Sequence, residues 1–205
     1  MKFLLASNNK DKIREFREVF TPYGVEILSL KDLNINVDPE ENGTTFKENA
    51  YIKASEIAKY SNHIIIADDS GIEIEALNGF PGIHSARFME NSTYDEKFVA
   101  LWDMLKDKEN KTCNFNCTLC VINLEENPIY FEGKVFGKIT TDIKGYSGFG
   151  YDPIFFYPEY NKTFGECTKE EKNAASHRGK AIRMLLDYLK EKKYIWENIK
   201  QFYLI

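Results

Sequence analysis

The first third of the chain alternates between short apolar runs and longer stretches whose apolar side chains recur at helical spacing. Apolar runs at residues 2–7 and 25–30 flank residues 12–20, where the apolar side chains fall on one side of a helix. Strands that alternate with helices pair in parallel, because the helix carries the chain back to the edge where the first strand began. This alternation predicts an α/β fold.

The middle of the chain adds two longer β-prone runs, residues 112–124 and 129–140. Only a short connection separates them, which predicts an antiparallel pair. Parallel and antiparallel parts together predict a mixed β-sheet flanked by helices. Further short strands are expected at residues 63–67, 72–75 and 153–157.

Three Thr-x-x-Glu sequences mark expected helix starts: Thr45–Glu48, Thr93–Glu96 and Thr168–Glu171. In such a capping box the threonine hydroxyl and the glutamate carboxylate each accept a hydrogen bond from a backbone amide at the helix start. We expect the first two helices to run to about residues 60 and 106, and the third to open the final helical region.

The composition supplies a hydrophobic core but no membrane segment. Hydrophobic residues make up 43% of the 205, with 15 Phe and 12 Tyr, which excludes a disordered chain. The apolar runs are far shorter than the roughly 20 residues that span a bilayer, so no membrane partner is expected. Four apolar residues after Met1-Lys2 do not make a secretory signal, which predicts a cytoplasmic location.

The charge balance argues against a nucleic-acid-binding protein. There are 27 Lys plus Arg against 32 Asp plus Glu, a formal charge of −5. Coating nucleic acid requires many cations that neutralise phosphates, so no nucleic-acid partner is expected. A small phosphorylated ligand needs only a local group of cations and stays compatible with this charge.

An acidic pair, Asp68-Asp69, follows the expected strand at residues 63–67. Adjacent carboxylates repel each other unless a cation neutralises them, and Mg²⁺ prefers oxygen ligands. Because strand side chains alternate, we expect only one of the two to be a direct ligand, with Glu40 or Glu41 as a second carboxylate. The alternative is that Asp68–Gly71 is simply a turn, since these residue types favour turns.

Lysines and short polar residues gather where the first expected strand gives way to a helix. Lys10 and Lys12 follow Ser7, Asn8 and Asn9, and unpaired backbone amides at a helix start also attract a phosphate. Neither a P-loop nor a dinucleotide-binding fingerprint is present. Further candidate cations lie at Lys53, Lys172, His177 and Arg178. The alternative for each lysine is an ordinary solvated side chain.

A glycine-rich stretch, residues 145–152, places Phe149 between Gly148 and Gly150. Glycines permit tight backbone turns, so the ring of Phe149 can project and stack on a nucleobase. The alternative is that Phe149 anchors the loop in the core.

Six sequence blocks in a fixed order together resemble a known family, whereas no single block is sufficient to indicate it. They are Leu5–Lys12, Thr45–Ala54, Ala67–Gly71, Pro81–Arg87, Gly148–Pro153 and Ser176–Gly179. In these blocks the chain, over about residues 2–190, resembles the inosine/xanthosine triphosphate pyrophosphatase family.

The resemblance implies an elongated mixed β-sheet flanked by helices, with two lobes and a cleft between them, spanning residues 1–205 as one domain. It also implies a cytosolic, Mg²⁺-dependent homodimer. Members of that family cleave ITP, dITP and XTP, which are non-canonical purine nucleoside triphosphates, to the monophosphate and pyrophosphate. Two other functions remain open: a non-catalytic nucleotide-binding module, and a Mg²⁺-dependent phosphohydrolase that removes only the terminal phosphate.

The resemblance also implies roles for individual residues. Asp69 would be the base that activates water, with Asp68 supporting it and Lys53 facing the phosphates, while Glu40 and Asp69 would bind Mg²⁺. The residues implied to bind substrate are Ser7, Asn8, Asn9, Lys10, Asp11, Lys12, Ser70, Phe149, Gly150, Tyr151, Asp152, Lys172, His177 and Arg178. Asn8 and Asp11 depart from the family pattern, in which many relatives carry glycine. Residues 192–205 extend beyond the resemblance.

Overall fold

The computed structural model describes residues 1–196, which divide into two compact units. The first unit contains residues 1–69, 118–131 and the chain from residue 181 onward. The second contains residues 70–117 and 132–180. The strand that carries Asp69 and Ser70 therefore contributes consecutive residues to different units.

The strands form the mixed sheet that the sequence predicts. They are β1 (Lys2–Leu5), β2 (Glu26–Ser29), β3 (Ile64–Ile74), β4 (Thr112–Ile122), β5 (Ile129–Ile139), β6 (Phe155–Tyr157) and β7 (Lys162–Thr163). Their order in the sheet is β2-β1-β3-β4-β5-β6-β7. β1 pairs in parallel with β2 and with β3, whereas β6 pairs antiparallel with β5 and with β7. β4 and β5 are neighbours joined by residues 123–128, a connection too short for a parallel crossover, so they are antiparallel as predicted.

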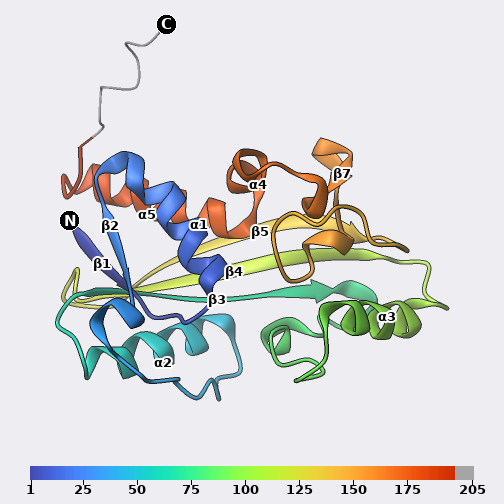
Figure 1. Ribbon diagram of the computed structural model, residues 1–205, viewed down its shortest axis with the longest axis horizontal. Coiled ribbons are helices and arrows are strands. Elements are labelled where there is room, and N and C mark those ends of the chain that lie inside the picture. The colour runs from blue at the N-terminus through green and yellow to red at the C-terminus, as the bar shows by residue number, and fades with distance from the viewer. Residues whose placement is uncertain (197–205) are drawn as a thin grey trace, which may run out of the picture. The chain divides into compact units, whose positions relative to one another are not determined.

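In the first unit, helices lie on both faces of the sheet (Figure 1). Helix α1 (Lys10–Phe20) connects β1 to β2, and α2 (Phe46–Ala58) precedes β3. Leu4 and Ile65 pack with Ala54 and Ile57 on the α2 side, whereas Phe3 meets Phe20 of α1 with ring centroids 5.9 Å apart. Because β1 pairs in parallel with β3 and its last residue, Leu5, lies opposite Ile66, residues 7–12 leave the sheet beside the part of β3 that carries Asp68.

Strand β3 is longer than the sequence predicts. Two short strands with a turn at Asp68–Gly71 were expected, but β3 runs without a break from Ile64 to Ile74. Gly71 lies so close to a neighbouring segment that a Cβ there would be 2.1 Å from the Gly82 carbonyl oxygen. Ile72 N also donates to Ser85 Oγ at 2.9 Å. These contacts hold the chain extended where its residue types favour a turn.

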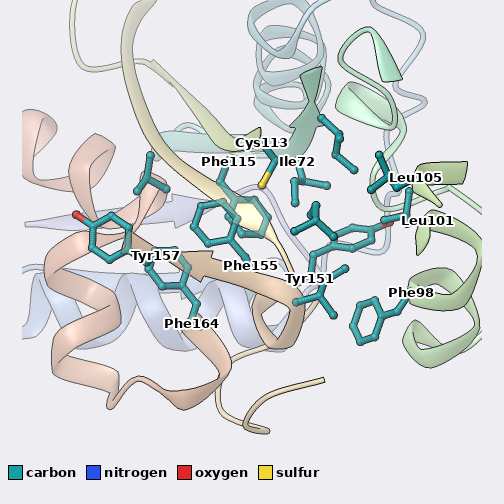
Figure 2. Packing of buried hydrophobic residues seen from close by; sticks show 14 of the residues in the cluster. Ile72, Phe98, Leu101, Leu105, Cys113, Phe115, Tyr151, Phe155, Tyr157 and Phe164 are labelled. Carbon is teal, nitrogen blue, oxygen red and sulfur yellow. The ribbon is translucent and has the colours of Figure 1, made fainter. Parts of the chain in front are cut away.

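Aromatic rings pack with aliphatic side chains in the core of the second unit, as Figure 2 shows. Phe155 is fully buried, with ring centroids 4.5 Å from Phe115 and 4.9 Å from Phe164. Helix α3 (Tyr94–Leu105) adds Phe98 and other apolar residues to the same cluster. This packing fixes β4 against the segment that follows the glycine-rich stretch.

The predicted capping boxes open three helices. Both halves of the box are present at Thr93 of α3 and at Thr168 of α4 (Lys169–Ala175). At α2 only one half is as predicted: Thr45 Oγ1 accepts from Glu48 N, but the Glu48 carboxylate accepts from Thr44. Other boundaries differ slightly, since α1 begins at Lys10 rather than Lys12.

Two further boundaries differ in the last third of the chain. Ser176 divides the final helical region into α4 and α5 (His177–Glu191). Residues 152–154 form a short 3₁₀ turn before β6, because Pro153 lacks the amide hydrogen that a strand ladder needs.

The extension predicted at residues 192–205 is described only in its first part. Tyr194 donates its hydroxyl to Glu125 Oε1 at 3.2 Å, and Ile195 is buried. Residues 197–205 lie outside the described residues. Within residues 1–196, no helix is long and apolar enough to cross a membrane.

We predict that Phe155→Ala lowers the free energy of unfolding by about 3–5 kcal/mol, because truncation of a buried ring leaves a cavity. Urea denaturation followed by circular dichroism measures the change. Phe136→Ala is the matched control, because Phe136 on β5 is 61% exposed and its truncation should change stability by less than about 1 kcal/mol. Equal losses in the two variants would contradict this description of the core.

Candidate active site

Lys53 of α2 is the centre of a buried cluster in the first unit. Its Nζ donates to Glu41 Oε1 at 2.6 Å, to Asp69 Oδ1 at 3.0 Å and to the Asp68 carbonyl oxygen at 2.8 Å. Lys53 and Asp69 are both buried. One ammonium group therefore holds two carboxylates, from a loop and from β3, in one place.

Asp68 has a different lysine. Lys12, in the first turn of α1, contacts Asp68 Oδ1 and donates to the Asp68 carbonyl oxygen at 3.2 Å. Successive side chains of a strand point to opposite faces. The adjacent carboxylates of Asp68 and Asp69 therefore meet separate cations, and each charge is paired.

The charges around Asp69 do not balance completely. Burial raises the pKa of the Asp69 carboxyl, the nearby Glu41 raises it further, and the Lys53 ammonium opposes both without cancelling them. Burial alone would lower the pKa of Lys53, but the attraction of Asp69 and Glu41 is stronger and the pKa is raised. Lys53 is therefore held as a cation, while Asp69 gives up its proton less readily than an exposed aspartate does.

The carboxylates of this cluster are suited to a hard divalent cation. Asp69 Oδ2 is buried and has no hydrogen-bond partner among residues 1–196, so one oxygen lone-pair site is open. Over the same residues, no group of three or more His, Cys, Asp or Glu side chains could hold a metal ion. Two carboxylates are what Mg²⁺ usually takes from a protein, with waters and substrate phosphates filling the rest.

The second carboxylate in this cluster is Glu41 rather than the adjacent Glu40. Glu41 contacts Lys53 and influences Asp69, whereas Glu40 is exposed. The sequence shows two acids in a loop and nothing that distinguishes them, because only the folded loop decides which one turns inward. The role predicted for Glu40 in binding Mg²⁺ stays a prediction, and the geometry favours Glu41.

The loop at residues 7–12 does not form a single phosphate cradle. The helix-start amides expected to be unpaired are capped, because Asn9 Oδ1 accepts from Asp11 N at 2.9 Å and from Lys12 N at 3.1 Å. Asn9 N itself donates to Ser7 Oγ. In this structure a phosphate would therefore compete with the Asn9 side chain for these amides.

The side chains of residues 7–12 also lie in different places. A groove of about 460 Å³ is lined by Ser7, Asn8 and Lys10 together with Arg14 and other residues of α1, β2 and the following turn. Lys12 instead reaches Asp68. Asp11, the acid that departs from the family pattern, forms an ion pair with Arg14 at 2.6 Å. Its charge is therefore neutralised by a neighbour one turn along α1.

A second cluster lies in the second unit, around the glycine-rich stretch. Asp152 Oδ2 accepts from Phe149 N at 2.7 Å and from Lys172 Nζ at 2.6 Å. Gly148 has φ +75°, and a Cβ there would be 2.2 Å from Asp152 Oδ2, so only glycine fits. A buried carboxylate thus fixes both the loop and the lysine.

Phe149 presents its ring to cations instead of anchoring the loop in the core. Lys172 Nζ lies 4.6 Å from the ring centroid and the Arg178 guanidinium carbon lies 5.4 Å from it. Arg178 Nη2 also donates to Ser70 Oγ at 3.3 Å. The structure thus brings together Ser70, Phe149, Lys172 and Arg178 of the predicted substrate-binding residues.

Two other predicted substrate-binding residues are occupied with packing. The His177 ring is buried and stacks on Phe115 at 4.6 Å. Tyr151 packs against Phe98, and its hydroxyl donates to the Ser85 carbonyl oxygen at 2.8 Å. Ser85 was not assigned a role from the sequence, yet it joins β3 to the glycine-rich stretch. No local pattern distinguishes it, since its partners are distant in sequence.

Comparison with known proteins places this chain among relatives of similar length. The Ham1 family model matches residues 3–188. A dITP/XTP pyrophosphatase of Clostridium perfringens is 46% identical over 199 residues, covering 92% of this chain and 97% of that protein. The solved structure of the Staphylococcus aureus Ham1 protein is 37% identical with a TM-score of 0.84, covering 94% and 100%. A nucleoside-triphosphatase or dITP/XTP pyrophosphatase from Mycobacterium abscessus is 38% identical with a TM-score of 0.72, covering 91% and 99%.

We predict that Asp69→Asn stabilises the metal-free protein at neutral pH. A carboxyl whose pKa is raised by folding contributes stability at acidic pH that is lost as the pH rises through the folded-state value. The neutral amide does not carry this penalty, so its advantage should be largest near pH 7–8 and shrink towards pH 4. Thermal unfolding in a chelator, followed across this pH range, measures the difference. Asp103→Asn, at an exposed ion pair with Lys106, should show no such trend.

Proposed function

This chain belongs to the Ham1 family, and on that premise we propose that it hydrolyses ITP, dITP and XTP to the nucleoside monophosphate and pyrophosphate. The observation that carries the proposal is the buried cluster in which Lys53 holds Glu41 and Asp69 while Asp69 Oδ2 stays open. Relatives named dITP/XTP pyrophosphatase support the choice of nucleotide.

Mg²⁺ is the cofactor that we propose for this reaction. Glu41 and Asp69 would hold it, and when bound it supplies positive charge that stabilises the departing pyrophosphate. Lys53 pairs with Asp69 and Lys12 pairs with the adjacent Asp68, so two further cations lie in this region. A triphosphate carries about four negative charges, so electrostatic stabilisation is the main requirement.

Asp69 is the residue that we propose as the general base. Its raised pKa makes the carboxylate a stronger proton acceptor than an exposed aspartate, and Lys53 keeps it ionised and oriented. Asp68 has its charge paired with Lys12 and acts by holding that lysine.

The cluster of the second unit suits an oxopurine. The half-buried ring of Phe149 is an aromatic group on which a base could stack, and Lys172 and Arg178, which lie over this ring, are donors without acceptor capacity. The 6-carbonyl of hypoxanthine or xanthine accepts hydrogen bonds, whereas adenine has an amino donor at that position. A donor that faces adenine would lose its partner, which penalises ATP.

We predict that incubation with ITP and Mg²⁺ releases pyrophosphate and IMP, because cleavage falls at the α-phosphorus. Asp69→Asn should lower kcat by about 10²–10⁴-fold, the usual contribution of a general base. Separate assays for pyrophosphate and orthophosphate distinguish the alternatives: orthophosphate alone indicates removal of the terminal phosphate, and no product with ITP bound indicates a binding module. Near-normal kcat in Asp69→Asn at saturating Mg²⁺ would remove this residue from the proposed role.

We also predict that kcat/KM for ITP and for XTP exceeds that for ATP by at least about 10²-fold. Arg178→Met should lower the ratio of kcat/KM for ITP to that for ATP, because it removes a donor near the Phe149 ring. Expressed as free energies, this loss of selectivity should exceed the loss of stability. Arg183→Met, on the same helix, serves as the matched control. Equal kcat/KM values for the three nucleotides in the unmodified protein would disprove the proposed selectivity.

The family resemblance also suggests a homodimer, a cytoplasmic location and no nucleic-acid partner. These remain proposals.

A further inference from the structure

Asn49 is a polar residue at a fully buried position of α2. Its relative exposure is 0%, and Phe46, Ala50 and Lys53 are buried on the same helix. Asn49 Oδ1 accepts a hydrogen bond from Gly43 N at 2.9 Å. The orientation of the amide follows from this contact, because only the oxygen can accept from an N–H group.

The other half of the Asn49 amide is unsatisfied. Its Nδ2 is buried and has no hydrogen-bond partner among residues 1–196. A buried donor without a partner is destabilising, and an apolar side chain of similar size would avoid this cost. Stability of the helix therefore does not account for an asparagine here, and the contact with Gly43 is what this side chain provides.

The contact between Asn49 and Gly43 is tight. A Cβ at Gly43 would lie 2.8 Å from Asn49 Oδ1 and 2.8 Å from Glu48 Cβ, so the loop can approach α2 only without a side chain. The next residue, Thr44, donates from its amide and its hydroxyl to Glu48 Oε2 at 2.7 and 2.8 Å. The loop is thus attached to the first turn of α2 at two successive residues.

This attachment lies close to Glu41 in the chain. Glu41 is two residues before Gly43, and its carboxylate meets Lys53, one helical turn beyond Asn49 on the same face of α2. Without the Gly43 anchor, the segment before Thr44 would lose an attachment to α2 two residues from Glu41 and would depend more on the Glu41–Lys53 contact. Glu41 would then lose part of its fixed position beside Asp69.

We propose that Asn49 is a positioning residue for the metal site: it holds the backbone at Gly43 so that Glu41 is placed to bind a divalent cation together with Asp69. This inference rests on the proposed function, which assigns the cation to these carboxylates. Groups that orient metal ligands typically contribute 10–100-fold to metal affinity. Asn49 thus acts through Glu41, without contact with the substrate.

Metal binding by the nucleotide-free protein tests this directly. Mn²⁺ is the probe, because the electron paramagnetic resonance signal of free Mn²⁺ reports the bound fraction. In Asn49→Ala we expect the Kd for Mn²⁺ to rise about 10–100-fold, and the Mg²⁺ concentration for half-maximal ITP turnover to rise by a similar factor. At saturating Mg²⁺, kcat should return to within about threefold of the unmodified protein. A general loss of structure would not be rescued in this way.

Two further variants complete the experiment. Asn42→Ala makes the same substitution at an exposed residue of the loop that Asn49 contacts, and it should leave the Mn²⁺ affinity unchanged. Gly43→Ala displaces the loop from the other side of the contact and should reproduce the effect of Asn49→Ala. If Asn49→Ala does not fold, as judged by circular dichroism, Gly43→Ala decides the question.

The inference and the proposed function fail in different ways. Unmodified Mn²⁺ affinity in Asn49→Ala and Gly43→Ala, alongside weakened binding in Asp69→Asn, would overturn the positioning role alone. Unmodified affinity in Asp69→Asn as well would overturn the metal site on which both rest.

Discussion

The site of the first unit depends on the ion pairs of one buried lysine ammonium. An unpaired charge at the position of Lys53 would cost several kcal/mol, so this side chain requires nearby carboxylates. Glu41, Asp69 and the Asp68 carbonyl oxygen satisfy it. These contacts join α2, the loop before it and strand β3. The groups that neutralise Lys53 therefore also fix the arrangement of these three segments.

The second unit uses the same device for a different purpose. There the buried charge is a carboxylate, Asp152, which the Lys172 ammonium and the Phe149 amide satisfy. In each unit one buried ion fixes a loop and a helix at once. The Asp152–Lys172 pair is costly to break on either side, because the remaining buried charge loses its partner. Lys53 differs, because Glu41 still pairs with it when the charge of Asp69 is removed. Rigid placement of functional side chains follows from the need to solvate charge inside the protein.

Much of this arrangement could be predicted from residue types and spacing. The parallel start of the sheet, the pair β4–β5 and the caps at Thr93 and Thr168 depend on local patterns, and they were correctly predicted. The unbroken course of β3 could not be, because Ser85 and Gly82 hold it from a distance. The choice between Glu40 and Glu41 likewise depends on how a loop turns. The capping of α1 by Asn9 was also not predicted, and it engages the amides that were expected to bind a phosphate.

Gly71 shows what such distant packing demands of the sequence. A single methyl group there would collide with the Gly82 carbonyl and push β3 outwards, although residue 71 carries no functional group of its own. Asp69, the proposed general base, lies two residues earlier on that strand, and a displacement of about 1 Å at such a group can lower the rate about 10²-fold. Residue 71 therefore affects the proposed site only through its small size, and a larger residue there would disturb the site without touching it.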